Sequence, residues 1–142
     1  MKRYRIGYTQ GVYDMFHIGH LNLIKHAKEQ CEKLIVGVNT DNLVEQYKSR
    51  KTVIPEKERV EIIRNLKDVD EALLVDTLDK LTLYKRLSFD VVFIGSDWKG
   101  TVRWEDTEKA LAAHGVDVVY LPYTPNVSST ILRLEKGKEV EE

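Results

Sequence analysis

The sequence contains a single cysteine, Cys31, which excludes an intrachain disulfide. It also lacks any apolar run that approaches the ~20 residues of a membrane-spanning helix. The N-terminal residues do not include the apolar region of a secretory signal. We therefore expect a protein of the reducing cytoplasm that does not insert into a membrane.

An excess of charge of either sign is missing as well. The 22 Lys and Arg residues oppose 23 Asp and Glu residues, which leaves a formal net charge of −1. A protein that coats nucleic acid is strongly basic, and this chain has no basic stripe with interleaved aromatic residues, so nucleic acid is not an expected partner. With only 8 glycines, 3 prolines and 42% hydrophobic residues, the chain is neither collagen-like nor disordered. Its 142 residues predict one domain with its own core.

Five short apolar runs predict a parallel β-sheet. Each run is rich in Val, Ile, Leu or Phe and is short enough to be a strand buried on both faces. Longer polar stretches with apolar residues at helical spacing separate the runs and predict crossover helices. This alternation predicts a single α/β domain with a doubly wound, five-stranded parallel sheet. The runs are Tyr4–Tyr8, Leu34–Asn39, Ala72–Val75, Val91–Gly95 and Val116–Leu121.

The helices are placed by their apolar spacing and by residues typical of helix ends. Pro55 suits the first turn of the second helix because its missing N–H would be unsatisfied there, and Gly115 is placed to end the fourth helix. A last short helix is expected at 129–136, ending at Gly137, before a charged tail at 138–142. The spaced apolar residues are Leu21, Ile24, Ala27 and Cys31 in the first helix, Val60, Ile63 and Leu66 in the second, Leu81, Tyr84 and Leu87 in the third, and Ala110 and Leu111 in the fourth.

A glycine-containing turn leads from the first strand into the first helix, with the sequence Thr9-Gln10-Gly11-Val12-Tyr13-Asp14-Met15-Phe16-His17-Ile18-Gly19-His20. Ligands of parallel sheets bind beyond the carboxyl ends of the strands, and free N–H groups at a helix N-terminus attract anions. His17 and His20 would lie on one face of the first turn and donate to phosphate oxygens, while Gly19 lets a phosphate approach the backbone. A bare H-x-x-H pair is more often two ordinary polar helix residues, but the glycine-containing approach after the first strand favours a phosphate site.

Polar segments also follow three other strands. After the fourth strand, the Asp97 carboxylate can accept from an amino group or a hydroxyl of a ligand, and Trp98 offers a flat apolar surface; the alternative is a structural turn with a packed Trp98. Trp104 is expected to pack in a helix. After the fifth strand, hydroxyls at 128–130 would form a second anion site facing the first, unless Ser128 is only an N-cap. The basic segment at 48–51 and Arg59 are either solvated or bound to phosphate, and their place at the carboxyl edge favours phosphate.

Two of these motifs resemble the signature of a known family. Gly11-Val12-Tyr13-Asp14 and His17-Ile18-Gly19-His20 are similar to the motif of the HIGH-motif nucleotidyltransferases, in the G-x-F-D-x-x-H-x-G-H form typical of cytidylyltransferases. Tyr13 replaces the common Phe. Among these enzymes, the chain is most similar to the bacterial glycerol-3-phosphate cytidylyltransferases.

Other segments extend the resemblance along nearly the whole chain. The basic segment and Arg59 are similar to the lysine-rich loop of that family and the arginine after it. Residues 94–100 resemble its G-D-D-W segment, with Ser96 in place of the first Asp. Residues 123–130 resemble its R-T-x-G-I-S-T-[ST] segment, with Tyr123 in place of Arg and Asn126 in place of Gly. The family's Trp-x-Gln-Lys stretch after the third strand is replaced here by Thr77-Leu78-Asp79-Lys80.

The resemblance implies a Rossmann-like catalytic domain at 1–137 that joins CTP to sn-glycerol 3-phosphate, releases pyrophosphate and CDP-glycerol, and serves teichoic acid or another surface polymer. It implies Mg²⁺ held mainly by the CTP phosphates, no metal ligands from the protein, and a possible homodimer. The implied catalytic residues are His17, His20 and Lys48. Nucleotide binding is implied for Thr9, Gln10, Gly11, Tyr13, Gly19, Asp97, Thr124, Ser128, Ser129 and Thr130, and contact with phosphates or the acceptor for Lys48, Arg50, Arg59 and Trp98.

Three other functions remain open at this point. An adenylyltransferase, or a cytidylyltransferase acting on phosphocholine or phosphoethanolamine, would use the same motifs. A regulatory domain would bind CTP without releasing pyrophosphate, although the intact pair of His17 and His20 argues against it.

Overall fold

The computed structural model describes residues 2–122, and these form a five-stranded sheet in which every neighbouring pair is parallel. The strand order is β3-β2-β1-β4-β5. The predicted doubly wound parallel sheet is therefore confirmed. Its strands are β1 (Tyr4–Gly11), β2 (Cys31–Asn39), β3 (Glu71–Val75), β4 (Val91–Gly95) and β5 (Asp117–Leu121).

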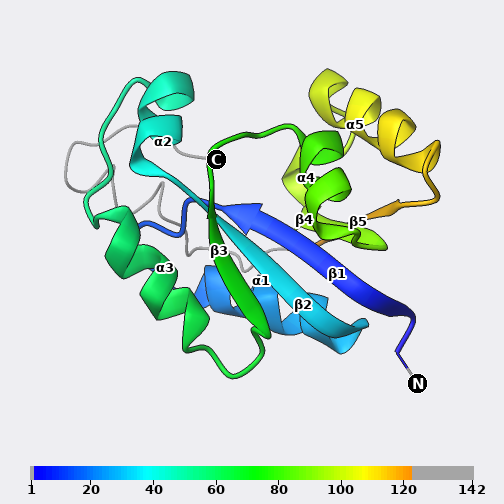
Figure 1. Cartoon of the computed structure of the whole chain (residues 1–142), viewed down its shortest axis with the longest axis horizontal. Coiled ribbons are helices and arrows are strands. Elements are labelled where there is room, and N and C mark those ends of the chain that lie inside the picture. The colour runs from blue at the N-terminus through cyan, green and yellow to red at the C-terminus, as the bar shows by residue number, and fades with distance from the viewer. Residues whose placement is uncertain (1, 123–142) are drawn as a thin grey trace.

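Helices cover both faces of the sheet (Figure 1). On one face, α1 and α3 bury Ile24 and Ile63 in a cluster with the inward side chains of β1, β2 and β4. On the other face, α4 and α5 bury Leu83 and Trp104 in a second cluster. The helices are α1 (Ile18–Glu29), α2 (Asp41–Lys48), α3 (Glu56–Arg64), α4 (Lys80–Leu87) and α5 (Val102–Ala112), with a 3-10 turn, η1, at Ser96–Trp98.

Two details differ from the sequence-based expectation. Cys31 was expected in the first helix, but α1 ends at Glu29 and Cys31 begins β2, where it is fully buried. The sequence analysis placed no helix between β2 and the second predicted helix, but Asp41–Lys48 form α2, capped by the Thr40 side chain, which accepts from the Leu43 N–H. The last predicted helix and the charged tail lie outside the described residues.

The strand order places β1 beside β4, and from these two strands the chain proceeds toward opposite edges of the sheet. From β1 the chain proceeds to β2 on one side, and from β4 it proceeds to β5 on the other side. In open parallel sheets, ligands bind in the crevice between the carboxyl ends of two such strands. The glycine-containing turn follows β1 and the Asp97–Trp98 turn follows β4, so both motifs flank this crevice. No helix within residues 2–122 is both long enough and apolar enough to cross a membrane.

Candidate functional site

The loop between β1 and α1 has an unusual backbone that is held by the loop before α3. Tyr13 (φ 56°) and Met15 (φ 52°) adopt the left-handed conformation, which costs non-glycine residues roughly 1–2 kcal/mol each. Between them, the buried Asp14 carboxylate accepts the N–H groups of Val53 and Ile54, each at 2.8 Å. These long-range hydrogen bonds join the two loops and offset the backbone strain.

The two histidines form a stacked pair at the start of α1. His17 is the N-cap residue, and its Nδ1 accepts the Gly19 N–H at 3.0 Å. His20 lies in the first turn, and its Nδ1 accepts the His17 N–H at 3.3 Å. The ring centroids are 3.9 Å apart with an interplanar angle of 20°. The structure therefore brings together the two residues that the sequence singled out.

These hydrogen bonds determine where a neutral ring carries its proton. Because Nδ1 of each ring accepts a hydrogen bond, we assign the proton of the neutral imidazole to Nε2. The rings of Tyr13 and Phe16 each pack against His20, both with centroids at 5.4 Å, and fix its orientation. Each histidine can thus use Nε2–H as a donor, on the side of the ring away from the capping backbone.

This arrangement changes how an anion would be bound at α1. The sequence suggested that free backbone N–H groups and the histidines would act together, with Gly19 allowing close approach. In the structure, the N–H groups of His17 and Gly19 already donate to the imidazoles. Those two backbone N–H groups are therefore not available to an anion at the start of α1.

The residues of β1 that were predicted to bind nucleotide make contacts within the protein at the carboxyl end of the strand. The Thr9 hydroxyl is buried and donates to the Phe93 carbonyl at 2.9 Å, which joins β1 to β4. Burial raises the pKa of Tyr13 above its usual value, against a smaller lowering by a hydrogen bond with Thr9. Gly11 lies against the Tyr13 ring, since a Cβ there would be 3.0 Å from the ring. The amide of Gln10 is used in hydrogen bonds within the protein.

The turn after β4 presents one exposed carboxylate and one half-buried ring. Asp97 is exposed, and its carboxylate lies over Gly95, where a Cβ would meet Oδ1 at 2.8 Å. Trp98 packs against the α4 and α5 face of the core, and the guanidinium of Arg103 is 5.6 Å from its ring centroid. Trp104 is almost fully buried, so its predicted packing role is confirmed. The sequence analysis did not identify the contact of Arg103 with Trp98.

The basic segment begins at a helix end. Lys48 is the last residue of α2, and its Nζ lies 5.6 Å from the ring centroid of Tyr47. Ser49 follows in the left-handed conformation, and Arg50 donates to the Lys51 carbonyl at 3.4 Å. Because Lys48 ends α2, its backbone position is set by that helix.

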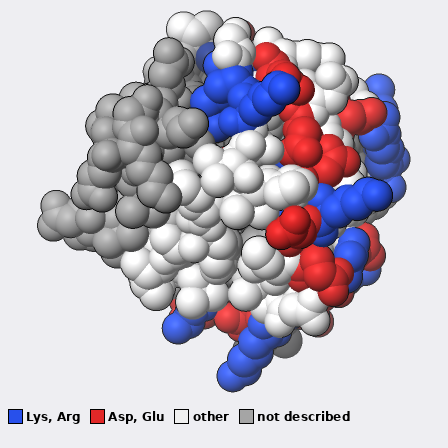
Figure 2. Space-filling model, turned by 90° about the vertical axis from the view of Figure 1, so that its left-hand side faces the viewer, with Lys and Arg blue, Asp and Glu red and all other residues white. Residues whose placement is uncertain are grey.

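On the face shown in Figure 2, one group of Lys and Arg side chains lies at the top, and acidic and basic side chains are mixed along one side.

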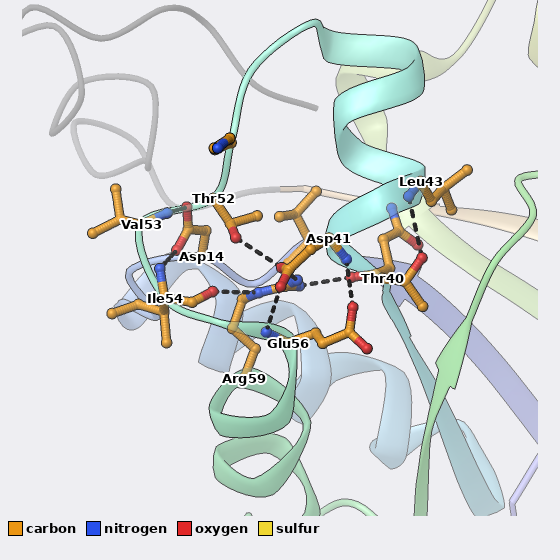
Figure 3. Close-up of polar contacts among 12 residues, drawn as sticks. Asp14, Thr40, Asp41, Leu43, Thr52, Val53, Ile54, Glu56 and Arg59 are labelled. Atoms are coloured by element: carbon orange, nitrogen blue, oxygen red, sulfur yellow. Dashed lines mark hydrogen bonds and ion pairs between the residues drawn. The ribbon is translucent and has the colours of Figure 1, made fainter.

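Arg59 requires a correction, because the structure does not leave its guanidinium available for phosphate. Its side chain extends from α3 toward Asp41 and is buried (Figure 3). Nε donates to the Ile54 carbonyl at 2.8 Å, and Nη1 donates to the carbonyls of Val12 and Asn39 at 2.7 and 2.8 Å. Nη2 forms an ion pair with Asp41 at 2.5 Å. Arg59 thus connects the loop between β1 and α1, the end of β2 and the loop before α3.

Asp41 completes this junction and was missed by the sequence analysis. Its carboxylate also accepts from the Thr52 hydroxyl at 2.8 Å and from the Glu56 N–H at 3.2 Å, while Glu56 accepts the Asp41 N–H in return. Burial raises the pKa of Asp41, but the hydrogen bonds from Thr52 and Arg59 outweigh this effect and lower the pKa overall. The acidic residue next to the Thr40 cap is the only sequence signal that pointed to this role.

The described carboxylates do not form a metal cage. Within residues 2–122, no group of three or more His, Cys, Asp or Glu side chains is arranged to hold a metal ion. Asp14 and Asp41 accept hydrogen bonds from backbone and side-chain donors of the protein. The expectation of Mg²⁺ held mainly by the CTP phosphates stays a prediction. The predicted contacts of Thr124, Ser128, Ser129 and Thr130 lie outside the described residues.

Comparison with known sequences relates the whole site region to nucleotidyltransferases. A family model described as cytidylyltransferase-like matches residues 8–135. An FAD synthase from Thermococcus kodakarensis is 35% identical over 117 residues, which cover 80% of this chain and 76% of that protein. The bifunctional protein HldE from Hyphomonas neptunium is 32% identical over 138 residues, which cover 94% of this chain. The chain spans only 28% of the length of HldE.

Comparison with solved structures concerns the fold alone. The lipopolysaccharide core biosynthesis protein from Thermoplasma volcanium matches with a TM-score of 0.71 at 23% identity, over 85% of this chain and 97% of that one. Pantoate-beta-alanine ligase from Francisella tularensis, complexed with beta-gamma ATP and beta-alanine, matches with a TM-score of 0.61 at 17% identity, over 96% of this chain and 70% of that one. The expected Rossmann-like fold is confirmed.

Proposed function

The chain belongs to the cytidylyltransferase-like family, and from this premise we propose that it joins CTP to sn-glycerol 3-phosphate to give CDP-glycerol and pyrophosphate. The observation that carries the proposal is the stacked pair of His17 and His20, with both Nδ1 atoms engaged by the backbone and both Nε2–H groups assigned as donors. The pair lies at the N-terminus of α1 beside the crevice between β1 and β4.

The reaction requires charge stabilisation and alignment rather than proton transfer. An oxygen of the acceptor phosphate attacks the α-phosphorus of the nucleotide, the bond from that phosphorus to the bridging oxygen of the β-phosphate breaks, and pyrophosphate leaves with the electron pair. Because the acceptor phosphate is already anionic at neutral pH, no general base is needed. The Nε2–H donors of His17 and His20 stabilise the charge that develops on the α-phosphate oxygens.

The surrounding residues complete the assignment. Lys48 and Arg50 balance the charge of the entering acceptor and the departing pyrophosphate, and Ser128, Ser129 and Thr130 hold the β- and γ-phosphates. Mg²⁺ on those phosphates supplies further neutralisation of charge when it is bound. Asp97 after β4 accepts from the cytosine amino group or a ribose hydroxyl.

A grid of nucleotides and acceptors tests this proposal. Pyrophosphate release is measured with CTP, UTP and ATP, each combined with sn-glycerol 3-phosphate, phosphocholine, phosphoethanolamine and no acceptor. The proposal expects release with CTP and sn-glycerol 3-phosphate together and none when the acceptor is left out. Release with ATP alone among the nucleotides contradicts the choice of CTP.

An adenylyltransferase is the second candidate, and one comparison favours it. A relative with 35% identity over most of its length is named an FAD synthase, and FAD contains an adenylyl group. The catalytic role of the histidine pair would be unchanged, since the α-phosphate is the same in ATP and CTP. The base-binding turn at Asp97 and Trp98 decides between the two nucleotides.

Nucleotide preference provides the first mutational prediction. A site that satisfies both the amino donor and the ring acceptor of cytosine leaves groups unpaired with UTP, at about 1–3 kcal/mol for each, so CTP is favoured over UTP by roughly tenfold to a hundredfold. Asp97→Ala is expected to narrow this ratio of kcat/KM values and to leave the affinity for pyrophosphate unchanged. Ser96→Ala, at the exposed neighbour, serves as the control and should keep the ratio. Equal use of CTP and UTP by the unmodified protein would refute the assignment of Asp97.

The basic segment provides the second prediction. Lys48→Gln and Arg50→Gln are each expected to raise the KM for CTP or for the acceptor by roughly tenfold to a hundredfold, since one charged hydrogen bond to phosphate contributes about 1.5–3 kcal/mol. The free energy of unfolding of each apo variant is measured alongside the KM values, because Lys48 and Arg50 are half-buried. Lys51→Gln is the matched control on the same segment, where Lys51 is exposed. A large loss of stability with unchanged KM values would assign Lys48 and Arg50 to structure instead.

A further inference from the structure

Gln10 near the end of β1 uses every polar atom of its amide within the protein. Its Oε1 accepts from the hydroxyl of the buried Tyr8 at 2.9 Å. Its Nε2 donates to Asn39 Oδ1 at 2.8 Å and to the Thr77 carbonyl at 2.9 Å. A primary amide has two N–H hydrogens, so both donors are accounted for. The side chain therefore has no donor left for the nucleotide that the sequence led us to expect there.

The chemistry of the partners fixes the orientation of this amide. The Thr77 carbonyl can only accept, so it requires the Nε2 side of Gln10 to face it. A glutamate of the same shape would place an oxygen against two acceptors and could donate to neither when ionised. Glutamine is therefore required for its two donors and not merely for its size.

The first of the two N–H bonds leads to the basic segment. Asn39 is fully buried at the end of β2, and its Nδ2 donates to the Tyr47 hydroxyl oxygen at 3.0 Å. Tyr47 is in the last turn of α2, directly before Lys48, whose Nζ packs over the Tyr47 ring. A chain of hydrogen bonds, each donated in the same direction, thus runs from Tyr8 through Gln10 to the helix end that carries Lys48.

The second N–H bond holds the connection between β3 and α4. Thr77 lies in that connection, and its hydroxyl accepts the N–H of Asp79, the N-cap residue of α4. The buried Lys80 follows, and its Nζ donates to the Leu78 carbonyl at 2.9 Å. One amide on β1 therefore fastens the segments that follow β2 and β3.

The sheet order indicates which substrate these two segments face. They follow β2 and β3 on one side of β1, whereas Asp97 follows β4 on the other side. The proposed function assigns the nucleoside to Asp97. The acceptor is therefore assigned to the β2 and β3 side, where Lys48 lies at the end of α2.

We propose that Gln10 is a positioning residue for the acceptor: its two N–H groups hold the Lys48 end of α2 and the Thr77–Lys80 segment at the spacing that the phosphorylated alcohol requires. This inference rests on the proposed function for the identity of the acceptor. The coupling of the two segments through Gln10 does not depend on that identity.

The test compares Gln10→Glu with Tyr8→Phe. Gln10→Glu keeps the acceptor for Tyr8 but removes both donors, and it is expected to raise the KM for sn-glycerol 3-phosphate about tenfold or more while the KM for CTP changes less than about twofold. Tyr8→Phe removes the hydroxyl on the other side of the amide, keeps the ring stacked on Phe89, and should leave both KM values unchanged. An equal rise of both KM values in Gln10→Glu, or the same effect in Tyr8→Phe, overturns the proposal.

A second variant covers the case in which Gln10→Glu does not fold. Tyr47→Phe cuts the chain of hydrogen bonds at its half-buried end and keeps the ring beneath Lys48. It is expected to raise the KM for sn-glycerol 3-phosphate about threefold, since one hydrogen bond contributes about 0.5–1.5 kcal/mol. An unchanged acceptor KM in this variant counts against the proposal.

Amide hydrogen exchange separates this inference from the proposed function. In Gln10→Glu, exchange is expected to become faster at both 41–48 and 77–80, and to stay as in the unmodified protein in Tyr8→Phe. If the unmodified protein transfers no nucleotide to any acceptor, the proposed function fails. The exchange pattern then decides separately whether Gln10 holds the two segments together. Unchanged exchange at either segment overturns it.

Discussion

Alanine at either His17 or His20 lowers kcat by about 10²–10³-fold and changes the KM for CTP far less, because each Nε2–H stabilises charge that develops only in the transition state. The structure strengthens this expectation beyond what the motif alone supports. Both rings are held by hydrogen bonds to Nδ1 and by stacking at 3.9 Å, so their donors are fixed before the substrate binds. Steady-state rates of pyrophosphate release provide the measurement.

Two control variants separate catalysis from helix capping. His17→Asn retains a side chain that can cap α1 but has no Nε2–H, so it should recover stability without recovering kcat. His26→Ala removes an exposed histidine of the same helix and should leave kcat unchanged. Near-normal turnover in a folded His17→Ala or His20→Ala protein would remove the histidine pair from the mechanism.

Arg59→Met lowers the free energy of unfolding by about 3–5 kcal/mol, because it leaves the carbonyls of Val12, Asn39 and Ile54 without their buried donor. The Asp41 side chain is 37% exposed, so loss of that ion pair contributes the smaller share. Methionine keeps the apolar stem of the arginine, so little additional destabilisation comes from an empty cavity. Urea denaturation of both proteins measures the difference.

Arg64→Met on the same helix is the matched control. Arg64 is exposed, pairs with Glu61 at 3.0 Å and donates to the Ala72 carbonyl at 3.4 Å. Its replacement should therefore change stability by less than about 1 kcal/mol. A protein with Arg59→Met that unfolds like the unmodified protein but binds CTP poorly would show that Arg59 contacts phosphate after all.

The strands were predictable because a strand buried on both faces leaves a continuous apolar run in the sequence. All five runs became strands of the sheet. The ends were less clear: β1 extends through Thr9, Gln10 and Gly11. The side chains of Thr9 and Gln10 form hydrogen bonds with β4 and β2 and do not join the apolar core. Polar residues at the carboxyl edge therefore conceal the end of a strand where the site begins.

The misplaced elements have local causes. Cys31 follows Ala27 by four residues, which matches helical spacing, and its Sγ does lie 3.4 Å from the Ala27 carbonyl although β2 has begun. The helix α2 buries only Leu43 and Val44 among its eight residues, so it shows little apolar periodicity. The sequence analysis consequently placed no helix before the basic segment that begins at Lys48.

The role of Arg59 could not be predicted from one sequence. Its partners are carbonyls from three segments, and a carbonyl is present at every residue, so no pattern of side chains marks them. The same holds for Asp14, which accepts backbone N–H groups about forty positions away. The histidine pair was predictable because its spacing is local and its chemistry belongs to the side chains.

The central claim is that this chain transfers the cytidylyl group to a phosphorylated alcohol. It is tested most directly with CTP labelled at the α-phosphorus and sn-glycerol 3-phosphate, by following the label and pyrophosphate together. The account predicts that the label moves into a CDP-alcohol with one pyrophosphate released for each product, and that His17→Ala slows both equally. Label that stays in CTP with every acceptor, in a protein shown to bind CTP, would contradict it.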